Sequence, residues 1–506
     1  MKQGGGQAVV VDKIPTGISG FDFISHGGLP RGRSTLVSGS SGSGKTVFAA
    51  QFLVEGIRKS GQPGVFVTFE ESPADIRKNV GALGLDVAGM EKDGVWAFVD
   101  ASPEHRGEVI RSGSFDLGAL MARMESAIRK VGADRLVLDS LGAVFNQFDD
   151  QGLIRAELFR IVSALKEMGV TSVMTAERID EYGEIARYGV EEFVTDNVVI
   201  LRNVLEEEKR RRTLEILKVR GGTHQKGEFP FTILPNEGIV VVPLSAIELK
   251  QSSTNLRIAS GSGDLDAMCG GGFFRDSIVL VSGATGTGKT LMVTEFIEGG
   301  ARSDERSLLF AFEESREQLF RNASGWGVDF EDLERRGKLR VICEYPEVSS
   351  LEDRLIRMKE AINRFKPQRI AVDSLSALER VATARAFREF VIALTAFIKH
   401  QETAGLFTST TPTLMGGTSV TEAHISTLTD SIILLRYVEI FGEMRRGITI
   451  LKMRGSQHDK EIREFTIDDR GMHIGKPFRN VSGILAGHPA HLPEGEIEKV
   501  AQLFRD

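Results

Sequence analysis

Two glycine-rich segments have the residue types and spacing of a phosphate-binding loop. They read GSSGSGKT at residues 39–46 and GATGTGKT at residues 283–290. In such a loop, consecutive backbone N–H groups turn toward phosphates, and the N-terminus of the next helix adds positive potential. We expect Lys45 and Lys289 to reach the β and γ phosphates of ATP. The nucleotide-binding residues expected from the two segments are Gly39, Gly42, Ser43, Gly44, Lys45, Thr46 and Val47, and Gly283, Thr285, Gly286, Thr287, Gly288, Lys289, Thr290 and Leu291.

A magnesium ion is expected beside each loop. Thr46 and Thr290 end the two loop motifs, and Asp139 and Asp373 each end an apolar run typical of a buried strand. A loop hydroxyl and a carboxylate from a neighbouring strand are common protein groups around the Mg²⁺ of a bound nucleotide. ATP and Mg²⁺ are therefore the expected cofactors, with these four residues nearest the metal.

Paired glutamates follow each loop. The segment FEES occurs at residues 69–72 and again at residues 312–315, which gives the pairs Glu70, Glu71 and Glu313, Glu314. Each pair comes directly after an apolar strand, where a carboxylate could accept a proton from water or from a hydroxyl attacking the γ phosphate. The alternative is that both pairs are ordinary acids in the first turn of a helix, where the helix dipole favours negative charge.

Cations recur in a third duplicated segment, ILKVRGGTHQK at residues 216–226 and ILKMRGSQHDK at residues 450–460. By analogy with arginine fingers they could reach the nucleotide of a neighbouring subunit, although solvated surface charge is an equally good interpretation. Trp326 is a candidate to stack on adenine, and a buried core tryptophan is the alternative. The residues expected at a neighbour's nucleotide are Lys218, Val219, Arg220, His224, Arg446, Lys452, Met453, Arg454 and Ser456.

These repeated motifs show that the chain contains two copies of one domain. Lys45 and Lys289 are 244 positions apart, and Asp139 and Asp373 are 234 apart, so loops differ in length between the copies. Short apolar runs alternate with helical patterns, which predicts an α/β fold: two tandem domains, each a mostly parallel sheet flanked by helices. We expect an N-terminal tail at 1–13, domains at 14–247 and 248–476, and a C-terminal tail at 477–506. The linker is expected near Val242 to Asn255, a polar, Ser-rich stretch.

The two copies differ in one segment. Thr421, Ser426 and Thr427 stand where the first copy has Arg187, Glu192 and Phe193. The hydroxyls of the second copy could accept a phosphoryl group. Glu192 and Phe193 of the first copy have no hydroxyl to accept one. The alternative is that Ser and Thr simply populate a loop.

Composition excludes several classes of protein. Lys and Arg number 63 against 70 Asp and Glu, a net charge of −7, so no overall positive charge favours nucleic acid. Two cysteines cannot form a disulfide framework, which favours a reducing cytoplasm. No stretch approaches ~18 uncharged apolar residues, and the N-terminus lacks the pattern of a signal peptide. We expect a soluble cytoplasmic protein without a membrane or nucleic-acid partner.

The motifs resemble those of the KaiC family, the double-domain RecA-type ATPases and autokinases of the cyanobacterial circadian oscillator. The likeness covers residues 14–475 and is carried by GATGTGKT, FEES, VDSLSAL, MCGGGFF, YGVEEFV, HISTLTDSIILL, YVEI, GEM and KMRGS. It implies two RecA-like P-loop domains and a homo-hexamer of two stacked rings that holds ATP between subunits. The first domain would hydrolyse ATP and the second would be an autokinase and autophosphatase. Residue by residue, Ser426 and Thr427 match the family's phosphorylation sites and Thr421 a nearby acceptor, while the two glutamate pairs match its catalytic pairs.

The resemblance also bears on partners. It favours a KaiB-like protein on the first ring and is compatible with downstream histidine-kinase signalling. The segment KPFRNVSGILAGHPAHLPEGEIEKVAQLFRD at residues 476–506 is only weakly similar to the family's C-terminal tail, so support for a KaiA-like activator is weaker. Two other functions stay open at this point: a nucleotide-gated signalling scaffold with ATPase but no kinase activity, and a RecA- or helicase-like DNA-dependent ATPase.

Overall fold

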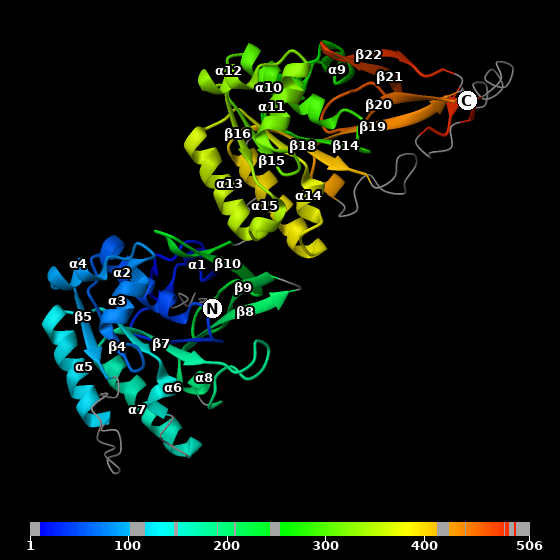
Figure 1. Ribbon diagram of the computed structural model, residues 1–506. Helices are drawn as coiled ribbons and strands as arrows, with labels where there is room; N and C mark the ends of the chain where they lie inside the picture. Colours follow the sequence, from blue (N-terminus) through cyan, green and yellow to red (C-terminus); the bar gives the residue numbers. More distant parts are fainter. Residues whose placement is uncertain are drawn as a thin grey trace, which may run out of the picture. The chain divides into compact units, whose positions relative to one another are not determined.

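The computed structural model describes residues 11–101, 117–145, 150–189, 191–206, 209–242, 253–411, 425–440, 442–479, 481–484 and 490–491. The chain divides into two compact units, Met1–Ala246 and Ile247–Asp506. Each unit is a nine-stranded sheet with helices on both faces (Figure 1), which confirms the predicted α/β class. Most of the segment expected as a linker, residues 243–252, lies outside the described residues.

Six neighbouring strands of the first unit run parallel, and three antiparallel strands extend the sheet at one edge. The order across the sheet is β11-β10-β9-β8-β3-β7-β6-β4-β5. In chain order the strands are β3 (Ser34–Gly39), β4 (Gly64–Thr68), β5 (Trp96–Asp100), β6 (Arg135–Asp139), β7 (Thr171–Glu177), β8 (Asn197–Glu206), β9 (Lys209–Val219), β10 (Glu228–Leu234) and β11 (Gly238–Val241). A separate small sheet pairs β1 (Lys13–Ile14) with β2 (Leu29–Pro30).

Both faces of this sheet are buried. Val37 and Phe66 belong to one hydrophobic cluster, whereas their chain neighbours Leu36 and Val65 belong to another, because successive side chains of a strand point to opposite faces. Figure 1 shows α2, α3 and α4 on one side of the strands and α5, α6 and α7 on the other. The helices are α1 (Phe21–Ile24), α2 (Lys45–Ser60), α3 (Pro73–Gly81), α4 (Val87–Lys92), α5 (Leu117–Val131), α6 (Leu141–Phe145), α7 (Gln151–Glu167) and α8 (Glu191–Val194).

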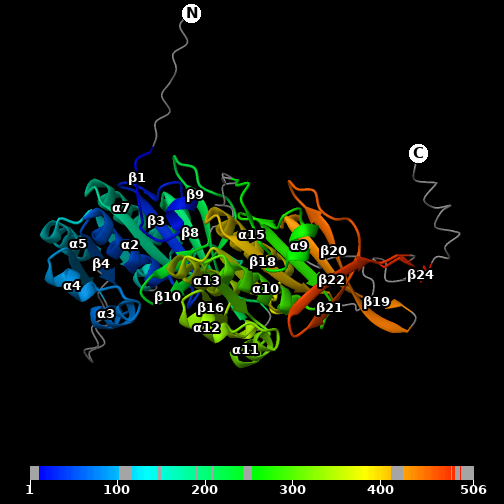
Figure 2. The same ribbon diagram turned by 90° about the horizontal axis from the view of Figure 1, so that it is seen from above.

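The second unit repeats this topology, with the strand order β16-β15-β17-β18-β14-β19-β20-β21-β22. Figure 2 shows β19 to β22 at one edge of its sheet. The strands are β14 (Ile278–Gly283), β15 (Ser307–Ala311), β16 (Leu339–Cys343), β17 (Arg369–Asp373), β18 (Ala404–Thr410), β19 (Ser431–Ile440), β20 (Glu443–Met453), β21 (Arg463–Asp468) and β22 (Gly471–Pro477), with a small sheet of β12 (Arg257–Ile258) and β13 (Phe273–Phe274). A further short pair, β23 (Val481–Ser482) and β24 (Ala490–His491), lies in the segment expected as a tail.

The helices of the second unit also divide between the two faces of the sheet (Figure 1). They are α9 (Gly263–Met268), α10 (Lys289–Arg302), α11 (Arg316–Gly325), α12 (Phe330–Arg335), α13 (Leu351–Phe365), α14 (Leu375–Glu379) and α15 (Ala384–His400), with short 3-10 turns η2 (Pro346–Val348) and η3 (Ile425–Thr427).

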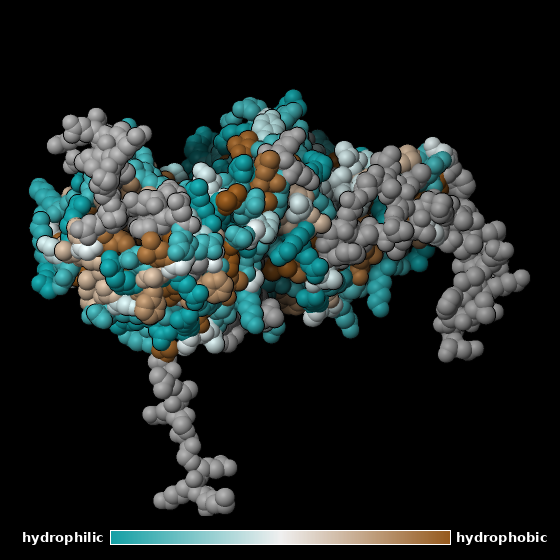
Figure 3. Space-filling model, turned by 90° about the horizontal axis from the view of Figure 1, so that it is seen from below, coloured by the Kyte–Doolittle hydropathy of each residue, from teal (hydrophilic) through white to brown (hydrophobic). Residues whose placement is uncertain are grey.

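Exposed apolar side chains occur among the polar ones. On α7, Leu153 and Phe159 are 43% and 62% exposed. Figure 3, which views the molecule from below, shows brown apolar residues among teal polar ones on that face. In the part of the chain that the structure describes, no helix combines the length and apolar character needed to cross a membrane.

Candidate functional site

Each glycine-rich segment forms the turn between a central strand and a helix. The first connects β3 to α2 and the second connects β14 to α10. Gly44 and Gly288 are the N-cap residues just before the helices and have φ values of 97° and 105°, a backbone conformation that favours glycine. The carbonyl oxygen of Leu435 would lie 2.6 Å from a Cβ on Gly283, so a side chain there would collide with β19. The loops can therefore keep this shape only with glycine at these positions.

The N-termini of α2 and α10 suit an anionic ligand. No side chain caps either helix, whereas Ser315 and Gln318 form a reciprocal capping box at α11 and Ser350 caps α13. The first N–H groups of a helix have no partner within it. At these two helices the groups point out of a glycine-rich turn, where phosphate oxygens can accept from them. The chain's own geometry thus fits the phosphates of a nucleotide.

The two loop lysines are held in the same way. Lys45 Nζ donates to the carbonyls of Gly39 at 2.9 Å and Ser40 at 3.0 Å, and Lys289 Nζ donates to those of Gly283 and Ala284, both at 2.9 Å. Burial lowers the pKa of both ammonium groups, and nearby carboxylates oppose this effect. Each positive charge therefore sits at the mouth of its loop, where a phosphate would bind.

The threonines and aspartates expected near a metal do meet. Thr290 Oγ1 donates to Asp373 Oδ2 at 2.8 Å, and a hydrogen bond from Thr46 favours the charged form of Asp139. Burial nevertheless raises the pKa of both aspartates. Two hydroxyl–carboxylate pairs at the ends of β6 and β17 have the oxygen donor chemistry that Mg²⁺ prefers.

The paired glutamates occupy matching places in the two units. The first glutamate of each pair accepts from a serine, Ser140 Oγ to Glu70 and Ser374 Oγ to Glu313, both at 3.0 Å. The second accepts from an asparagine, Asn79 to Glu71 at 3.1 Å and Asn322 to Glu314 at 3.0 Å. Burial raises the pKa of Glu70 and of Glu314, which brings these carboxylates closer to a proton-accepting role near neutral pH.

The helix-turn alternative for these acids is wrong. Ser72 is the N-cap of α3 and Ser315 is the N-cap of α11, so both glutamate pairs precede the helix in the strand-to-helix loop. Sequence reasoning missed their serine and asparagine partners, and it also missed Arg380, whose Nη2 lies 2.8 Å from Glu313 Oε1. The serines were detectable, because Ser140 and Ser374 stand at matching positions in the repeated segments LDSL and VDSL.

The cations Lys452 and Arg454 of the third duplicated segment lie at the other end of the sheet from the phosphate-binding loop. Arg454 follows β20, whose Met453 pairs with Ser431 at the start of β19, and β19 runs parallel to β14. The loop begins only after the six residues of β14, a rise of about 20 Å. A subunit's own Arg454 and phosphate-binding loop are thus separated by the length of the central strand.

Lys452 and Arg454 donate to backbone carbonyls at residues 427–429, in the segment that carries the candidate phosphate acceptors. Lys452 Nζ donates to the carbonyl of Thr429 at 2.6 Å, and Arg454 Nη2 donates to that of Thr427 at 3.1 Å. In the first unit Lys218 and Arg220 make the matching bonds to Thr195 at 2.9 Å and Phe193 at 3.2 Å.

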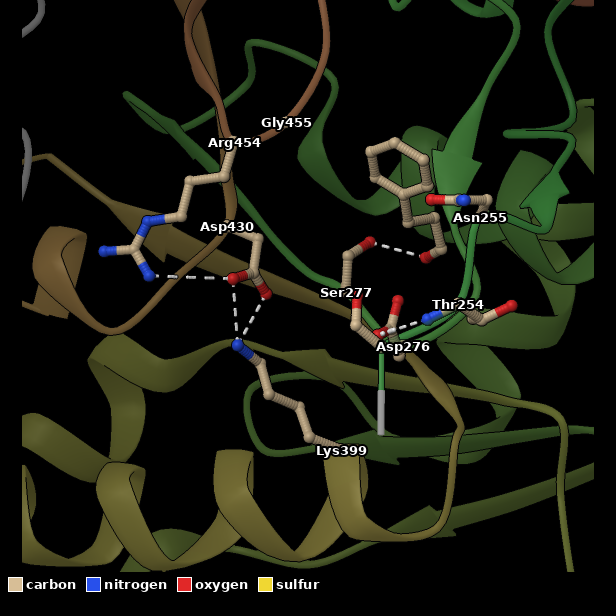
Figure 4. A pocket seen from close by; sticks show the side chains of 10 residues that line it. Thr254, Asn255, Asp276, Ser277, Lys399, Asp430, Arg454 and Gly455 are labelled. Carbon is tan, nitrogen blue, oxygen red and sulfur yellow. Dashed lines mark hydrogen bonds and ion pairs between the residues drawn. The ribbon is translucent and has the colours of Figure 1, made fainter. Parts of the chain in front are cut away.

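A pocket with a volume of about 410 Å³ opens beside these cations in the second unit. Figure 4 shows Lys399 and Arg454 converging on Asp430, at N–O distances of 2.7 and 3.8 Å. Asp430 Oδ2 also accepts the N–H of Ile278 at 2.8 Å, at the first residue of β14. This carboxylate therefore fixes the cations relative to the central strand.

The candidate phosphate acceptors lie at this same end. Ser426 and Thr427 are in the 3-10 turn η3, just before Asp430, and Thr427 is exposed. Thr421 lies outside the described residues. The turn η3 and the phosphate-binding loop of the same unit therefore lie at opposite ends of β14.

The remaining candidates have mixed surroundings. Val47, Val219 and Trp326 are partly buried against the hydrophobic cores, and Leu291 and Met453 are buried. Arg446 lies 5.8 Å from the ring centre of Tyr437, and Ser456 Oγ accepts from Arg257 at 2.5 Å. Burial lowers the pKa of His224.

Comparison with known proteins decides what these sites belong to. The family model described as "ATPase: KaiC" matches residues 14–246 and 258–478. The chain belongs to the KaiC ATPase family. It is 66% identical to "Circadian clock protein KaiC3" of Synechocystis sp. over 494 residues, 98% of each chain. It is 57% identical to the "Circadian clock oscillator protein KaiC" of Thermostichus vulcanus, over 98% of this chain and 95% of that one, and 56% identical to that of Synechococcus elongatus with the same coverage.

Membership in the KaiC family confirms the predicted resemblance and the two tandem RecA-like domains. It also confirms a KaiC-type clock ATPase that uses ATP. Neither the DNA-dependent ATPase nor the scaffold without kinase activity is favoured by these relatives.

Proposed function

We propose that this KaiC-family ATPase is also a serine/threonine autokinase. It hydrolyses MgATP in the first unit and transfers phosphate in the second to Ser426 and Thr427 of a neighbouring copy. The observation that carries this proposal is the placement of η3 and the phosphate-binding loop at opposite ends of β14. A single unit cannot bring its own acceptor to its own γ phosphate, whereas a ring of copies can.

Hydrolysis in the first unit follows from the groups around the loop. A water molecule held by Glu70 or Glu71 attacks the γ phosphorus and gives its proton to the carboxylate. The bond from the γ phosphorus to the β–γ bridging oxygen breaks, and ADP and inorganic phosphate leave. Lys45 and the N–H groups at the start of α2 stabilise the charge that builds up on the phosphates.

Phosphoryl transfer in the second unit uses the same parts with a different nucleophile. The hydroxyl of Ser426 or Thr427 replaces water, its proton goes to Glu313 or Glu314, and ADP leaves. In the reverse reaction the phosphoryl group passes from Ser426 or Thr427 to the β phosphate of bound ADP, the glutamate returns its proton to the hydroxyl, and ATP forms again; this is the proposed autophosphatase activity. Arg380 Nη2, at 2.8 Å from Glu313 Oε1, holds this carboxylate in place beside the loop.

Magnesium would be held by Thr46 with Asp139 and by Thr290 with Asp373, and it would neutralise part of the phosphate charge. Lys452 and Arg454 of one copy would face the nucleotide of the next, with Lys218 and Arg220 doing the same in the first ring. Head-to-tail sharing of this kind can close into a ring, and we propose a homo-hexamer with one ring per unit. A cytoplasmic location, a KaiB-like partner and downstream histidine-kinase signalling belong to the same proposal, and a KaiA-like activator has weaker support.

The test is phosphorylation mapped by mass spectrometry. Tryptic cleavage gives one peptide, residues 400–436, that holds Thr421, Ser426 and Thr427. After incubation with MgATP we expect phosphate on Ser426 and Thr427, its loss in Lys289→Ala, and its retention in the matched Lys45→Ala variant.

Transfer between subunits has its own test. Protein that carries Lys289→Ala is mixed with protein that carries Ser426→Ala and Thr427→Ala. The mixture is incubated with MgATP so that subunits exchange between assemblies. Phosphate should then appear on the Lys289→Ala chains, which have acceptors but no working loop. Phosphorylation that never appears in this mixture, while the unmixed wild type is phosphorylated, contradicts transfer between subunits.

A further inference from the structure

A buried carboxyl joins the loop-bearing helix of the second unit to an edge hairpin. Glu295 lies in α10, six residues after the loop lysine, and is 9% exposed. Its Oε1 accepts the N–H of Met472, at the start of β22, at 2.7 Å. Gly471, with φ of 107°, lies so close that a Cβ there would be 2.5 Å from the same oxygen. The turn between β21 and β22 is thus shaped around this side chain.

The first unit has the same connection with a different residue. Gln51 in α2 is 2% exposed, and its Oε1 accepts the N–H of Ile239 at 2.7 Å. Its Nε2 donates to the carbonyls of Glu237 at 3.0 Å and Ile239 at 3.2 Å. A Cβ on Gly238 would lie 2.5 Å from Gln51 Oε1. Gln51 and Glu295 are 244 positions apart, the offset of the loop lysines.

The hairpin that is tied in this way also touches the phosphate-binding loop. A Cβ on Gly288 would be 2.9 Å from Ile467 Cδ1 of β21 and 3.5 Å from Met472 Cε. In the first unit, a Cβ on Gly44 would be 3.0 Å from Ile233 Cδ1 of β10. Movement of the hairpin away from the helix would therefore change the packing behind the last glycine of the loop.

Gln and Glu differ in what they can donate. An amide always carries N–H donors, whereas a carboxyl has a donor only when it is protonated. By analogy with Gln51, a protonated Glu295 can donate to a carbonyl of the β21–β22 turn while it accepts the N–H of Met472. An ionised Glu295 still accepts the N–H of Met472 but has no proton to donate, and its charge is costly in this buried place.

The charged groups around Glu295 leave its titration in the neutral range. Burial raises its pKa to about 7, and the N–H of Met472 opposes the rise. Of the neighbouring charges, Glu298 raises the pKa, and Arg302 and His473 lower it. Arg302 pairs with Glu298 at 2.6 Å, and His473 with Asp468 at 2.8 Å. The folded unit prefers the protonated form, so this contribution to stability is complete below the pKa of an unfolded carboxyl and is lost as the pH rises through 7.

We propose that Glu295 is a positioning residue for the second phosphate-binding loop, and that it holds the β21–β22 hairpin to α10 more tightly when it carries a proton. The second unit would then respond to pH, whereas the first unit, with Gln51, would not. This inference rests on the proposed role of the second loop in holding the ATP that donates phosphate.

The first experiment measures nucleotide affinity of the full chain between pH 5.5 and 8.5. A non-hydrolysable ATP analogue is titrated into a Lys45→Ala background, so that the second loop is the one measured. From pH 6 to pH 8 the dissociation constant should rise about fivefold, as expected for the loss of one hydrogen bond. Glu295→Gln should bind as the wild type does at pH 6 and show no such rise. The same rise in Glu295→Gln would overturn the proposal.

The second experiment needs no nucleotide. Amide hydrogen exchange of a peptide that covers residues 468–474 is compared between wild type and Glu295→Gln at each pH, which cancels the intrinsic pH dependence of exchange. The wild-type peptide should exchange faster than the variant above pH 7 and equally at pH 6. A constant ratio across the range would overturn the proposal even if the second loop binds ATP and Ser426 becomes phosphorylated.

The converse variant completes the design. Gln51→Glu should give the first unit the pH dependence that it lacks, measured in a Lys289→Ala background. Absence of nucleotide binding by the second loop at every pH would instead contradict the proposed kinase site, and the exchange experiment would still decide the role of Glu295.

Discussion

Arg369 offers a sharp test of how the second unit is held together. Its side chain is 1% exposed at the start of β17. Nε donates to Glu305 Oε2 at 2.6 Å, and Nη1 donates to the carbonyls of Ala259 at 2.7 Å and Phe296 at 2.9 Å. The guanidinium carbon lies 4.9 Å from the ring centre of Phe296. One side chain thus joins the central sheet, the segment before α9 and the helix that carries the phosphate-binding loop.

The variant Arg369→Met keeps most of the volume and removes every donor. Three acceptors lose a partner, and about 1–1.5 kcal/mol for each gives a loss of about 3–5 kcal/mol in the free energy of unfolding. The same range holds for removing one member of a buried ion pair. Glu305 keeps its contact with Arg275, so a larger loss is not expected.

The two tryptophans of the chain make the assay specific to one unit. Trp96 lies in the first unit and Trp326 in the second, so in a Trp96→Phe background the fluorescence of Trp326 reports unfolding of the second unit in denaturant. The matched control is Arg385→Met, since Arg385 is 78% exposed and pairs with Glu389 one helical turn away. It should cost no more than about 0.5 kcal/mol.

The test compares the losses in the free energy of unfolding caused by Arg369→Met and Arg385→Met. A loss below about 1 kcal/mol for Arg369→Met, or a loss equal to that of Arg385→Met, would refute the reasoning that these three buried hydrogen bonds stabilise the unit.

Two further predictions concern the first active site and the backbone of the second unit. Replacing Glu70 and Glu71 with Gln should lower phosphate release from the first unit about 10²–10⁴-fold, while the peptide that contains residues 425–427 still becomes phosphorylated. Unchanged release would contradict the role given to this pair. Gly261→Ala should cost at least about 2 kcal/mol, because Gly261 has φ of 104° and its Cβ would lie 1.9 Å from a backbone carbonyl oxygen of α10. Gly263→Ala is the control, since nothing lies within 4 Å of its added Cβ; equal effects, measured by Trp326 fluorescence, would rule out the clash.

The contacts of the phosphate-binding loops were predictable from the sequence because they are local. The bonds of Lys45 and Lys289 reach carbonyls within six residues along the chain. Such contacts depend on the spacing of consecutive residues and on glycine at particular backbone angles. The α/β class was predictable for a similar reason, since alternating apolar runs and helical patterns predict parallel strands. The three antiparallel strands at one edge of each sheet were not predicted, because their pairing depends on which strand lies at the edge.

The partners of the paired glutamates needed the tertiary structure. Glu70 meets Ser140, which is 70 positions away, and Arg380 meets Glu313 across 67 positions. Long-range contacts of this kind depend on which strands are neighbours in the sheet, and the order β4-β6 and β15-β17 cannot be read from local spacing.

By itself the sequence determined that one nucleotide-binding domain is present twice, and that only the second copy has Ser426 and Thr427 where the first has Glu192 and Phe193. Only the tertiary structure decided that these acceptors lie a strand's length from the loop of their own unit. The physical reason is that β19 runs parallel to β14. The segment before one strand and the loop after the other must therefore lie at opposite ends of the sheet.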